Sequence, residues 1–228
     1  INNFILLDKI NKNKRLLLST GMSNLKNIAE SINRIFKLKI YRVQKNNNVK
    51  INKFFLKKII KRINVMHCVT DYPVENLYAN LKAINYLKDK LKLDVGYSDH
   101  TRGISAPIVA VAYGAKVIEK HLTLDKKMPG PDHVASLDLN EFKAMCIEIR
   151  NIEKMLGNGI KKIEKCEKKN IKIAKKSLVA KKLIKKGDIL SLDNVTAKRP
   201  FNGTSPDKID MIINSKSKKN YLKDDLIK

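Results

Sequence analysis

The sequence lacks tryptophan and has few of the residues that punctuate or cross-link a chain. Its 228 residues include nine glycines, six prolines and three cysteines. The cysteines, Cys68, Cys146 and Cys166, are odd in number and scattered, with neither metal-ligand spacing nor a disulfide framework. Because disulfides persist in oxidising compartments, this usage predicts a protein of the reducing cytoplasm.

Long apolar runs are absent as well. No stretch of about 18 apolar residues is present, so we expect no transmembrane helix and no membrane partner. No signal peptide is evident at the start. The first residue is Ile1 rather than Met, which leads us to expect that an N-terminal part is missing. A hydrophobic content of 43% is nevertheless enough for a packed core.

Acidic residues are scarce relative to basic ones. The chain has 22 Asp and Glu against 48 Lys and Arg, a net charge of +26. Such a charge fits a polyanionic partner. The lysines are spread along the chain without interleaved aromatics, however, and no helix-turn-helix or RNA-recognition signature is evident. A drift of composition toward Lys, Asn and Ile explains the charge better, and we expect no nucleic-acid partner. A positive field would still attract a small anionic substrate.

Short apolar runs alternate with amphipathic segments through most of the chain. Strands are expected at 14–19, 64–68, 93–98 and 116–120. Helices are expected at 24–36, 51–63, 76–92, 104–113 and 137–156. Ser23 is the expected cap of the first of these helices, and 37–50 is expected to be an exposed loop. Four strand–helix units predict parallel strands with right-handed crossovers, as in a barrel or an open α/β sheet.

The composition changes after Gly159. The Lys- and Glu-rich segment 161–176 is typical of a linker, and short strands and turns follow it. We therefore expect three parts: a main domain at 1–158, a linker at 159–172 and a small domain at 173–228. A module of roughly 55 residues is marginal for an independent core, so we expect it to pack on a partner.

Two histidines stand just beyond expected strands. His100 follows the strand at 93–98, and His121 follows the strand at 116–120. The carboxyl ends of parallel strands meet at one rim, so one strand–helix unit should bring the two imidazoles side by side. Two neutral imidazoles suit a divalent transition metal. Alternatively, they are unrelated surface histidines, because the spacing is not specific.

Hydroxyl side chains also follow the expected strands. They are Ser19, Thr20, Thr70, Tyr72 and Ser98. Hydroxyls and backbone N–H groups at strand ends bind phosphate, although Ser and Thr serve turns equally well.

Two carboxylates in the same stretch are candidates for chemistry. Glu119 and Asp132 could act as acid or base or bind sugar hydroxyls, or they could form ion pairs with nearby lysines. The sequence Pro129-Gly130-Pro131 predicts a rigid loop that holds Asp132 in place. His67 lies inside an expected strand, and we interpret it as a core histidine.

Five ordered motifs resemble the N-acetylneuraminate (sialic acid) synthase family. They are STGMS at 19–23, HCVTDYP at 67–73, GYSDHT at 96–101, VIEKHLTLDK at 117–126 and PGPDH at 129–133. The order and spacing agree over about residues 14–156. The tail, with KSLVA, IKKGD and KRPFNG, is similar to the family's antifreeze-like (SAF) domain. The KRPxNG loop favours the sialic or legionaminic acid branch over the pseudaminic branch.

The resemblance implies a fold and a reaction. The fold is α/β: the C-terminal half of a TIM (β/α)8 barrel followed by a small β-clip SAF domain. The family condenses phosphoenolpyruvate with an N-acylated amino sugar such as N-acetylmannosamine, giving a nine-carbon 2-keto sugar acid and phosphate. It also implies a divalent metal, usually Mn²⁺ with Mg²⁺ or Co²⁺ as alternatives, and a domain-swapped homodimer.

Site residues follow from the same resemblance. His100 and His121 would hold the metal. Phosphoenolpyruvate would contact Ser19, Ser98 and Thr70. The sugar would be held or protonated by Tyr72, Glu119 and Asp132, and Arg199 would reach the N-acyl group in the partner subunit's site.

The sequence departs from the family pattern in three ways. It supplies what look like the last four of eight barrel strands, without the half that carries an acidic residue and phosphoenolpyruvate-binding lysines. The segment at 37–50 is longer than usual. Thr70 stands where the family has Asn, and Phe201 where it has Gly. Two alternatives therefore stand beside an active synthase: an inactive remnant, and a basic polyanion-binding protein on the same scaffold.

Overall fold

A computed structural model describes residue 1, residues 3–11 and residues 13–227. The chain divides into two compact units, Ile1–Gly159 and Ile160–Lys228. No helix within the described residues is both long enough and apolar enough to cross a membrane.

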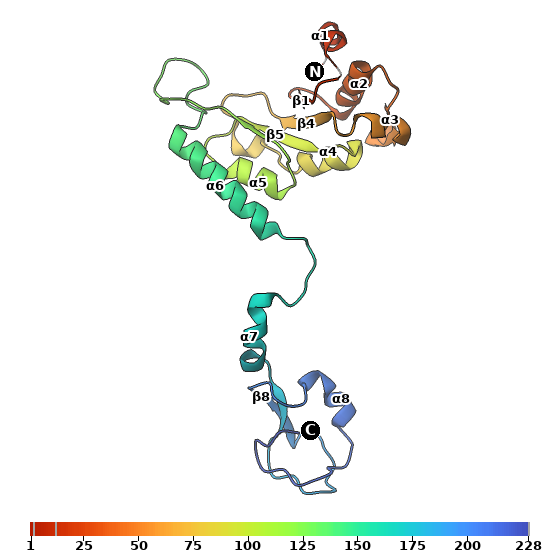
Figure 1. The fold of residues 1–228 in the computed structure, drawn as a ribbon, viewed down its shortest axis with the longest axis vertical. Helices are drawn as coiled ribbons and strands as arrows, with labels where there is room; N and C mark the ends of the chain where they lie inside the picture. The colour runs from red at the N-terminus through yellow and green to blue at the C-terminus, as the bar shows by residue number, and fades with distance from the viewer. Residues whose placement is uncertain (2, 12, 228) are drawn as a thin grey trace. The chain divides into compact units, whose positions relative to one another are not determined.

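The first unit is built on a four-stranded parallel sheet (Figure 1). Its strands, in spatial order, are β1 (Leu16–Ser19), β4 (Ile63–Cys68), β5 (Val95–Asp99) and β6 (Ile118–Lys120). All four expected strands are confirmed, each within two residues of its predicted ends. Spatial order follows chain order, so every connection crosses over to the neighbouring parallel strand.

Helices cover the outer face of this sheet. They are α1 (Phe4–Lys9), α2 (Leu25–Phe36), α3 (Lys53–Ile59), α4 (Ala83–Leu91), α5 (Ser105–Ala112) and α6 (Leu139–Leu156). The main core joins strand residues such as Val65 and Val95 to helix residues such as Ile32 and Ile84, which are all fully buried. Each such side chain contributes about 1.5–3 kcal/mol by leaving water. The unit is a partial TIM barrel with a curled parallel sheet.

Alternate residues of β5 face opposite sides of the sheet. Val95 and Tyr97 belong to the core beneath the helices, so Gly96 and Ser98 face the concave inner side. A Cβ on Gly96 would collide with the Met66 side chain and lie 2.7 Å from the Val117 carbonyl oxygen. Close packing between neighbouring strands therefore requires glycine in the GYSDHT motif.

The predicted cap of α2 was wrong by one residue. The Asn24 side chain accepts a 3.0 Å hydrogen bond from the Asn27 backbone N–H. The Asn27 side chain in turn accepts one from the Asn24 backbone N–H. The Ser23 hydroxyl instead donates to the Gly21 carbonyl. Helix α5 ends at Ala112, one residue before the predicted end, and Gly114 follows with a φ of +91°.

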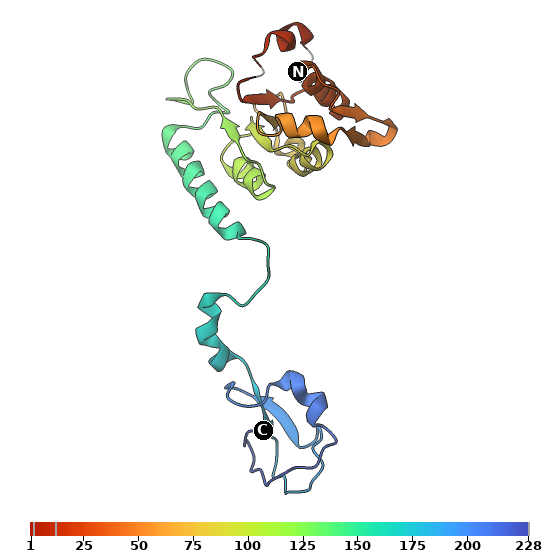
Figure 2. The same cartoon turned by 45° about the vertical axis from the view of Figure 1, so that its right-hand side comes forward.

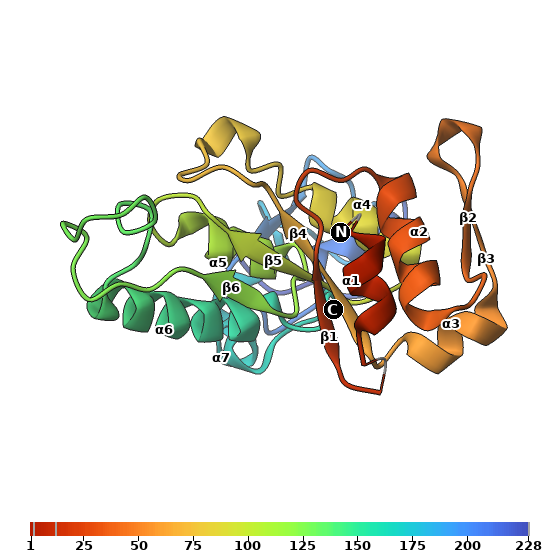
Figure 3. The same cartoon turned by 90° about the horizontal axis from the view of Figure 1, so that it is seen from above.

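The expected loop at 37–50 was also wrong. It contains an antiparallel hairpin, β2 (Tyr41–Val43) and β3 (Val49–Ile51), with a short 3-10 turn η1 (Lys45–Asn47) at its tip. The hairpin lies beside α2 (Figure 3), where the Asn33 side chain binds the backbone N–H of Ile40 and of Tyr41. Two strands of three residues carry too short a pattern to be recognised among lysines and asparagines.

Two helices are shorter than predicted. The segment at 76–92 forms a 3-10 turn, η2 (Asn76–Tyr78), and then α4, while the segment expected at 51–63 is helical only in α3. The loop between β6 and α6 extends away from the sheet (Figure 2).

The second unit has a small core of its own. Its elements are α7 (Lys165–Ala174), β7 (Ser177–Ala180), β8 (Val195–Lys198), η3 (Pro206–Lys208) and α8 (Ile209–Ile212). The strands pair antiparallel, and the core gathers Leu178, Ile184, Tyr221 and Ile227. The segment at 159–172, expected as a linker, overlaps α7.

Candidate active site

Two imidazoles meet at the carboxyl ends of β5 and β6. The ring centroids of His100 and His121 are 5.3 Å apart. The Tyr72 ring lies against both, with its centroid 4.2 Å from that of His100 and 5.7 Å from that of His121. The two histidines predicted to share one rim are therefore neighbours in space.

A backbone carbonyl fixes the orientation of the His100 ring. Its Nδ1 lies 2.8 Å from the Val69 carbonyl oxygen, which can only accept a hydrogen bond. We therefore assign the proton of the neutral ring to Nδ1, which leaves Nε2 as the nitrogen that could bind a ligand. No group of three or more His, Cys, Asp or Glu side chains is arranged to hold a metal in the part of the chain that the structure describes. Two imidazoles still fit a divalent ion whose remaining ligands are substrate or water oxygens.

Cys68 is a member of this cluster that sequence reasoning did not single out. Its thiol lies close to His100, Ser98 and Thr70, which all influence its ionisation. Burial is the largest single influence and opposes ionisation of this thiol. His100, Ser98 and Thr70 together outweigh it, so the pKa of Cys68 lies below its usual value. The contact with Cys68, working against burial, raises the pKa of His100. The signal in the sequence was that Cys68 ends the expected strand at 64–68. In the structure it pairs in register with Ser98 on β5.

Ser98 and Glu119 are joined across the strand pair. The Ser98 hydroxyl donates a 2.7 Å hydrogen bond to Oε1 of Glu119. Glu119 also influences the pKa of Tyr72. Partial burial and the negative charges of Cys68, Asp132 and Glu119 together raise the pKa of the Tyr72 hydroxyl. The predicted phosphate-binding and sugar-binding groups thus share one electrostatic environment.

Asp132 reaches this cluster from the loop between β6 and α6. Its Oδ2 lies 3.9 Å from Nδ1 of His121. The loop is held by the Thr123 hydroxyl, 2.8 Å from Nδ1 of His133, and by the Ser136 hydroxyl, which donates to the Asp132 carbonyl. These bonds hold the loop in which Asp132 lies beside His121.

The hydroxyls at β1 and β4 occupy different environments. Ser19 ends β1 and is exposed. The Thr20 hydroxyl is buried and donates to the Met66 carbonyl, so it serves the fold rather than a ligand. Thr70 is exposed and lies directly against Gly21, where a Cβ would collide with its hydroxyl. Ser19 and Thr70 remain available to a ligand.

Arg199 belongs to the second unit. It is exposed, and its Nε donates a 2.9 Å hydrogen bond to the Ala174 carbonyl at the end of α7. The hydrogen bond that Arg199 makes therefore lies within the second unit.

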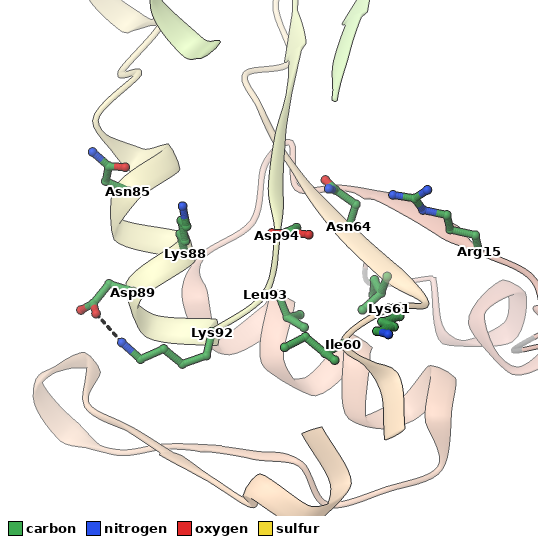
Figure 4. Close-up of a pocket in the computed structure, with 11 residues that line it drawn as sticks. Arg15, Ile60, Lys61, Asn64, Asn85, Lys88, Asp89, Lys92, Leu93 and Asp94 are labelled. Atoms are coloured by element: carbon green, nitrogen blue, oxygen red, sulfur yellow. Dashed lines mark hydrogen bonds and ion pairs between the residues drawn. The ribbon is translucent and has the colours of Figure 1, made fainter. Parts of the chain in front are cut away.

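A cavity of about 840 Å³ lies at the opposite, amino ends of the strands (Figure 4). Asn64 lines it from β4, Arg15 and Asp94 line it from the positions just before β1 and β5, and Lys92 pairs with Asp89 at its edge. Asn64 is buried, and its amide atoms have no hydrogen-bond partner within the described residues. None of the predicted site residues lines this cavity, so the candidate site is the histidine rim.

Comparison with known proteins identifies the family of this chain. Residues 1–161 match the NeuB family model, and residues 175–228 match the SAF domain model. The chain belongs to the NeuB family. It is 50% identical to the N,N'-diacetyllegionaminic acid synthase of Campylobacter jejuni over the whole of this chain and 63% of that relative. It is 41% identical to a C. jejuni pseudaminic acid synthase over 72% of this chain and 47% of that one.

Solved structures in this family share the fold. The crystal structure of N-acetylneuraminic acid synthetase from Leptospira borgpetersenii, in complex with citrate, superposes with a TM-score of 0.59 at 31% identity. That match covers 74% of this chain and 52% of the Leptospira chain. This NeuB chain spans about three-fifths of the length of the C. jejuni N,N'-diacetyllegionaminic acid synthase.

Proposed function

We propose that this chain carries the carboxyl-terminal part of a nonulosonic acid synthase. The reaction joins phosphoenolpyruvate to an N-acylated amino sugar such as N-acetylmannosamine and consumes one water, giving a nine-carbon sialic acid-type 2-keto sugar acid and inorganic phosphate. The observation that carries this proposal is the His100–His121 pair, with ring centroids 5.3 Å apart at the strand ends and the Tyr72 ring against both. Membership of the NeuB family supports this reaction as the one in which the pair would take part.

His100 and His121 would hold the divalent ion, Mn²⁺ by preference and Mg²⁺ or Co²⁺ as alternatives. Such an ion supplies Lewis acidity toward a sugar aldehyde. The Val69 carbonyl fixes the His100 ring for this role through its bond to Nδ1.

The hydroxyls would bind phosphoenolpyruvate. Ser19, Thr70 and Ser98 follow or end three neighbouring strands, where they can donate to phosphate and carboxylate oxygens. The net charge of +26 would draw the trianionic substrate toward the protein.

Glu119, Asp132 and Tyr72 would act on the sugar. When the new carbon–carbon bond forms, the aldehyde oxygen becomes a hydroxyl and must gain a proton. Glu119 or Asp132 could take up the proton released by the water that adds to phosphoenolpyruvate and pass it to this oxygen. Both carboxylates lie close enough to Tyr72 to raise its pKa. Tyr72 would orient the sugar against the two imidazoles.

Arg199 would complete the sugar site of the partner subunit in a domain-swapped homodimer. Its exposed guanidinium suits a contact with an N-acyl oxygen. The 50% identity to a legionaminic acid synthase supports the sialic or legionaminic branch. Three free cysteines support a reducing, cytoplasmic location.

A phosphate-release assay tests the proposal. The chain would be supplied with phosphoenolpyruvate and a panel of N-acylated amino sugars, with and without Mn²⁺. A second sample would extend the chain with the corresponding N-terminal part of the C. jejuni relative, because this chain spans 63% of that protein. We expect sugar-dependent phosphate release with Mn²⁺ in the extended chain. Its absence there with every sugar would refute a synthase and favour an inactive remnant.

A further inference from the structure

A buried ion pair lies directly behind the two histidines. Lys120 Nζ is 2.7 Å from Oδ2 of Asp99, and the two side chains are 1% and 0% exposed. In the other ion pairs of the described residues, each side chain is at least 36% exposed. Among the ion pairs of the described residues, the Asp99–Lys120 pair is therefore the one that is buried.

The pair is embedded in a closed network. Oδ1 of Asp99 accepts a 3.0 Å bond from the Tyr97 hydroxyl and a 2.8 Å bond from the Thr101 backbone N–H. Lys120 also donates to the Thr101 carbonyl. Both charges are therefore satisfied on the helix-covered side of the sheet, opposite Ser98 and Glu119.

The chain positions of this pair matter most. Asp99 and Lys120 are register partners in the parallel β5–β6 ladder. Asp99 immediately precedes His100, and Lys120 immediately precedes His121. Asp99 also accepts a hydrogen bond from the backbone N–H of Thr101. The network therefore includes Asp99 and Thr101, the residues on both sides of His100. The separation of the two imidazoles is thereby tied to one Nζ–Oδ2 contact.

Stability alone is a weak reason for such a pair. Desolvating two opposite charges costs about as much as their attraction returns, and apolar replacements are often neutral or stabilising. Directional bonds, however, fix the relative position of two strand ends in a way that apolar contacts do not.

We propose that Asp99 and Lys120 are positioning residues that hold His100 and His121 at the spacing needed to bind one metal ion. This inference rests on the proposed function in treating the histidines as a metal pair. It adds a requirement for two residues that touch neither the ion nor the substrate.

Co²⁺ binding to the 228-residue chain tests the inference, with visible absorption as the readout. The main variant is the double substitution Asp99→Asn with Lys120→Met, which removes both charges and leaves neither partner buried and unpaired. His121→Ala gives the single-imidazole reference. Lys126→Met is the matched control, because it removes the partly exposed pair with Glu141, 2.5 Å apart. Thermal unfolding of every variant is measured in parallel.

We expect wild type and Lys126→Met to bind Co²⁺ alike. The folded double variant should bind roughly 10- to 100-fold more weakly, near the His121→Ala level, as for other losses of support behind metal ligands. Three results would overturn the inference: a folded double variant with wild-type Co²⁺ affinity, a wild type that binds no better than His121→Ala, or a double variant that does not fold. Neither phosphoenolpyruvate nor a sugar is needed, so a chain that binds Co²⁺ normally yet releases no phosphate would refute the synthase alone.

Discussion

The Ser98 hydroxyl donates a 2.7 Å hydrogen bond to Oε1 of Glu119, joining two strands on the concave face of the half barrel. The bond holds one carboxylate oxygen toward β5. If Glu119 acts on the sugar, its orientation depends on this donor. The two residues should therefore depend on each other in catalysis.

Ser98→Ala removes that donor. We expect phosphate release by the extended chain to fall roughly 10-fold or more, since hydrogen bonds to charged groups are worth about 1.5–3 kcal/mol. Steady-state kinetics with varied phosphoenolpyruvate and sugar would measure the change. Ser105→Ala, at the exposed start of α5, is the control. Equal rates for the two variants would contradict the dependence.

His100→Ala or His121→Ala should abolish Mn²⁺-dependent turnover. Loss of Lewis-acid stabilisation removes several kcal/mol, so the rate should fall by at least roughly 100-fold. Phosphate release across a Mn²⁺ titration is the measurement, with the exposed Lys127→Ala as control. Full activity of either histidine variant would refute the metal assignment.

Arg199→Ala should mainly weaken use of the amino sugar. Losing a charged contact to the N-acyl group should raise the sugar KM roughly 10-fold, with little effect on the KM for phosphoenolpyruvate. Lys198→Ala is a matched control, because this neighbouring cation pairs with Asp224 instead. An unchanged sugar KM and rate in Arg199→Ala would remove Arg199 from the site.

His67 should make stability depend on pH. Burial lowers the pKa of its imidazole, against the opposing effect of its 2.9 Å contact with the Ala79 carbonyl. The unfolded chain then takes up the proton more readily than the native state. The contribution of His67 is therefore present above about pH 6.5 and lost as pH falls toward the native pKa.

Urea unfolding at a series of pH values would measure this effect. The slope of unfolding free energy against pH should be shallower in His67→Gln than in wild type below about pH 6.5. Parallel slopes for the two proteins would exclude His67 as the cause.

Gly96→Ala should destabilise the first unit. The added Cβ would meet the Met66 side chain and the Val117 carbonyl, and backbone cannot move aside cheaply. We expect a loss of about 1–3 kcal/mol in denaturant unfolding. Gly203→Ala is the comparison, because its Cβ would lie 2.9 Å from the flexible end of Leu226. A larger loss at Gly203 would contradict the packing argument.

The sequence predicts the parallel strands and the histidine rim because both depend on local patterns. Four apolar runs bounded by polar residues mark β1, β4, β5 and β6, and His100 and His121 sit one strand–helix unit apart. The β2–β3 hairpin could not be predicted in this way. Its strands have only three residues each, and the Asn33 side chain that binds the start of β2 belongs to the preceding helix, outside any pattern within 41–51.

The sequence predicted several side chains that lie together at the strand ends, but not Cys68 and not the contacts among them. Residues at strand ends follow from topology, which placed Ser98, Glu119 and Tyr72 together. The contact of Cys68 with His100 and the burial of Asp99 with Lys120 depend on which side chains pack against them in three dimensions. A charged residue near a strand end has the same appearance in sequence whether it faces solvent or the core.

The alternation of faces along β5 sets how this chain tolerates changes in length. Loss of one residue from Val95–Asp99 would turn Asp99 toward the concave side and Ser98 toward the helices, because side chains alternate with a period of two. The β2–β3 tip at Lys45–Asn47 carries no such constraint. Insertions and deletions among related chains should therefore gather at that tip and spare the last residues of the parallel strands.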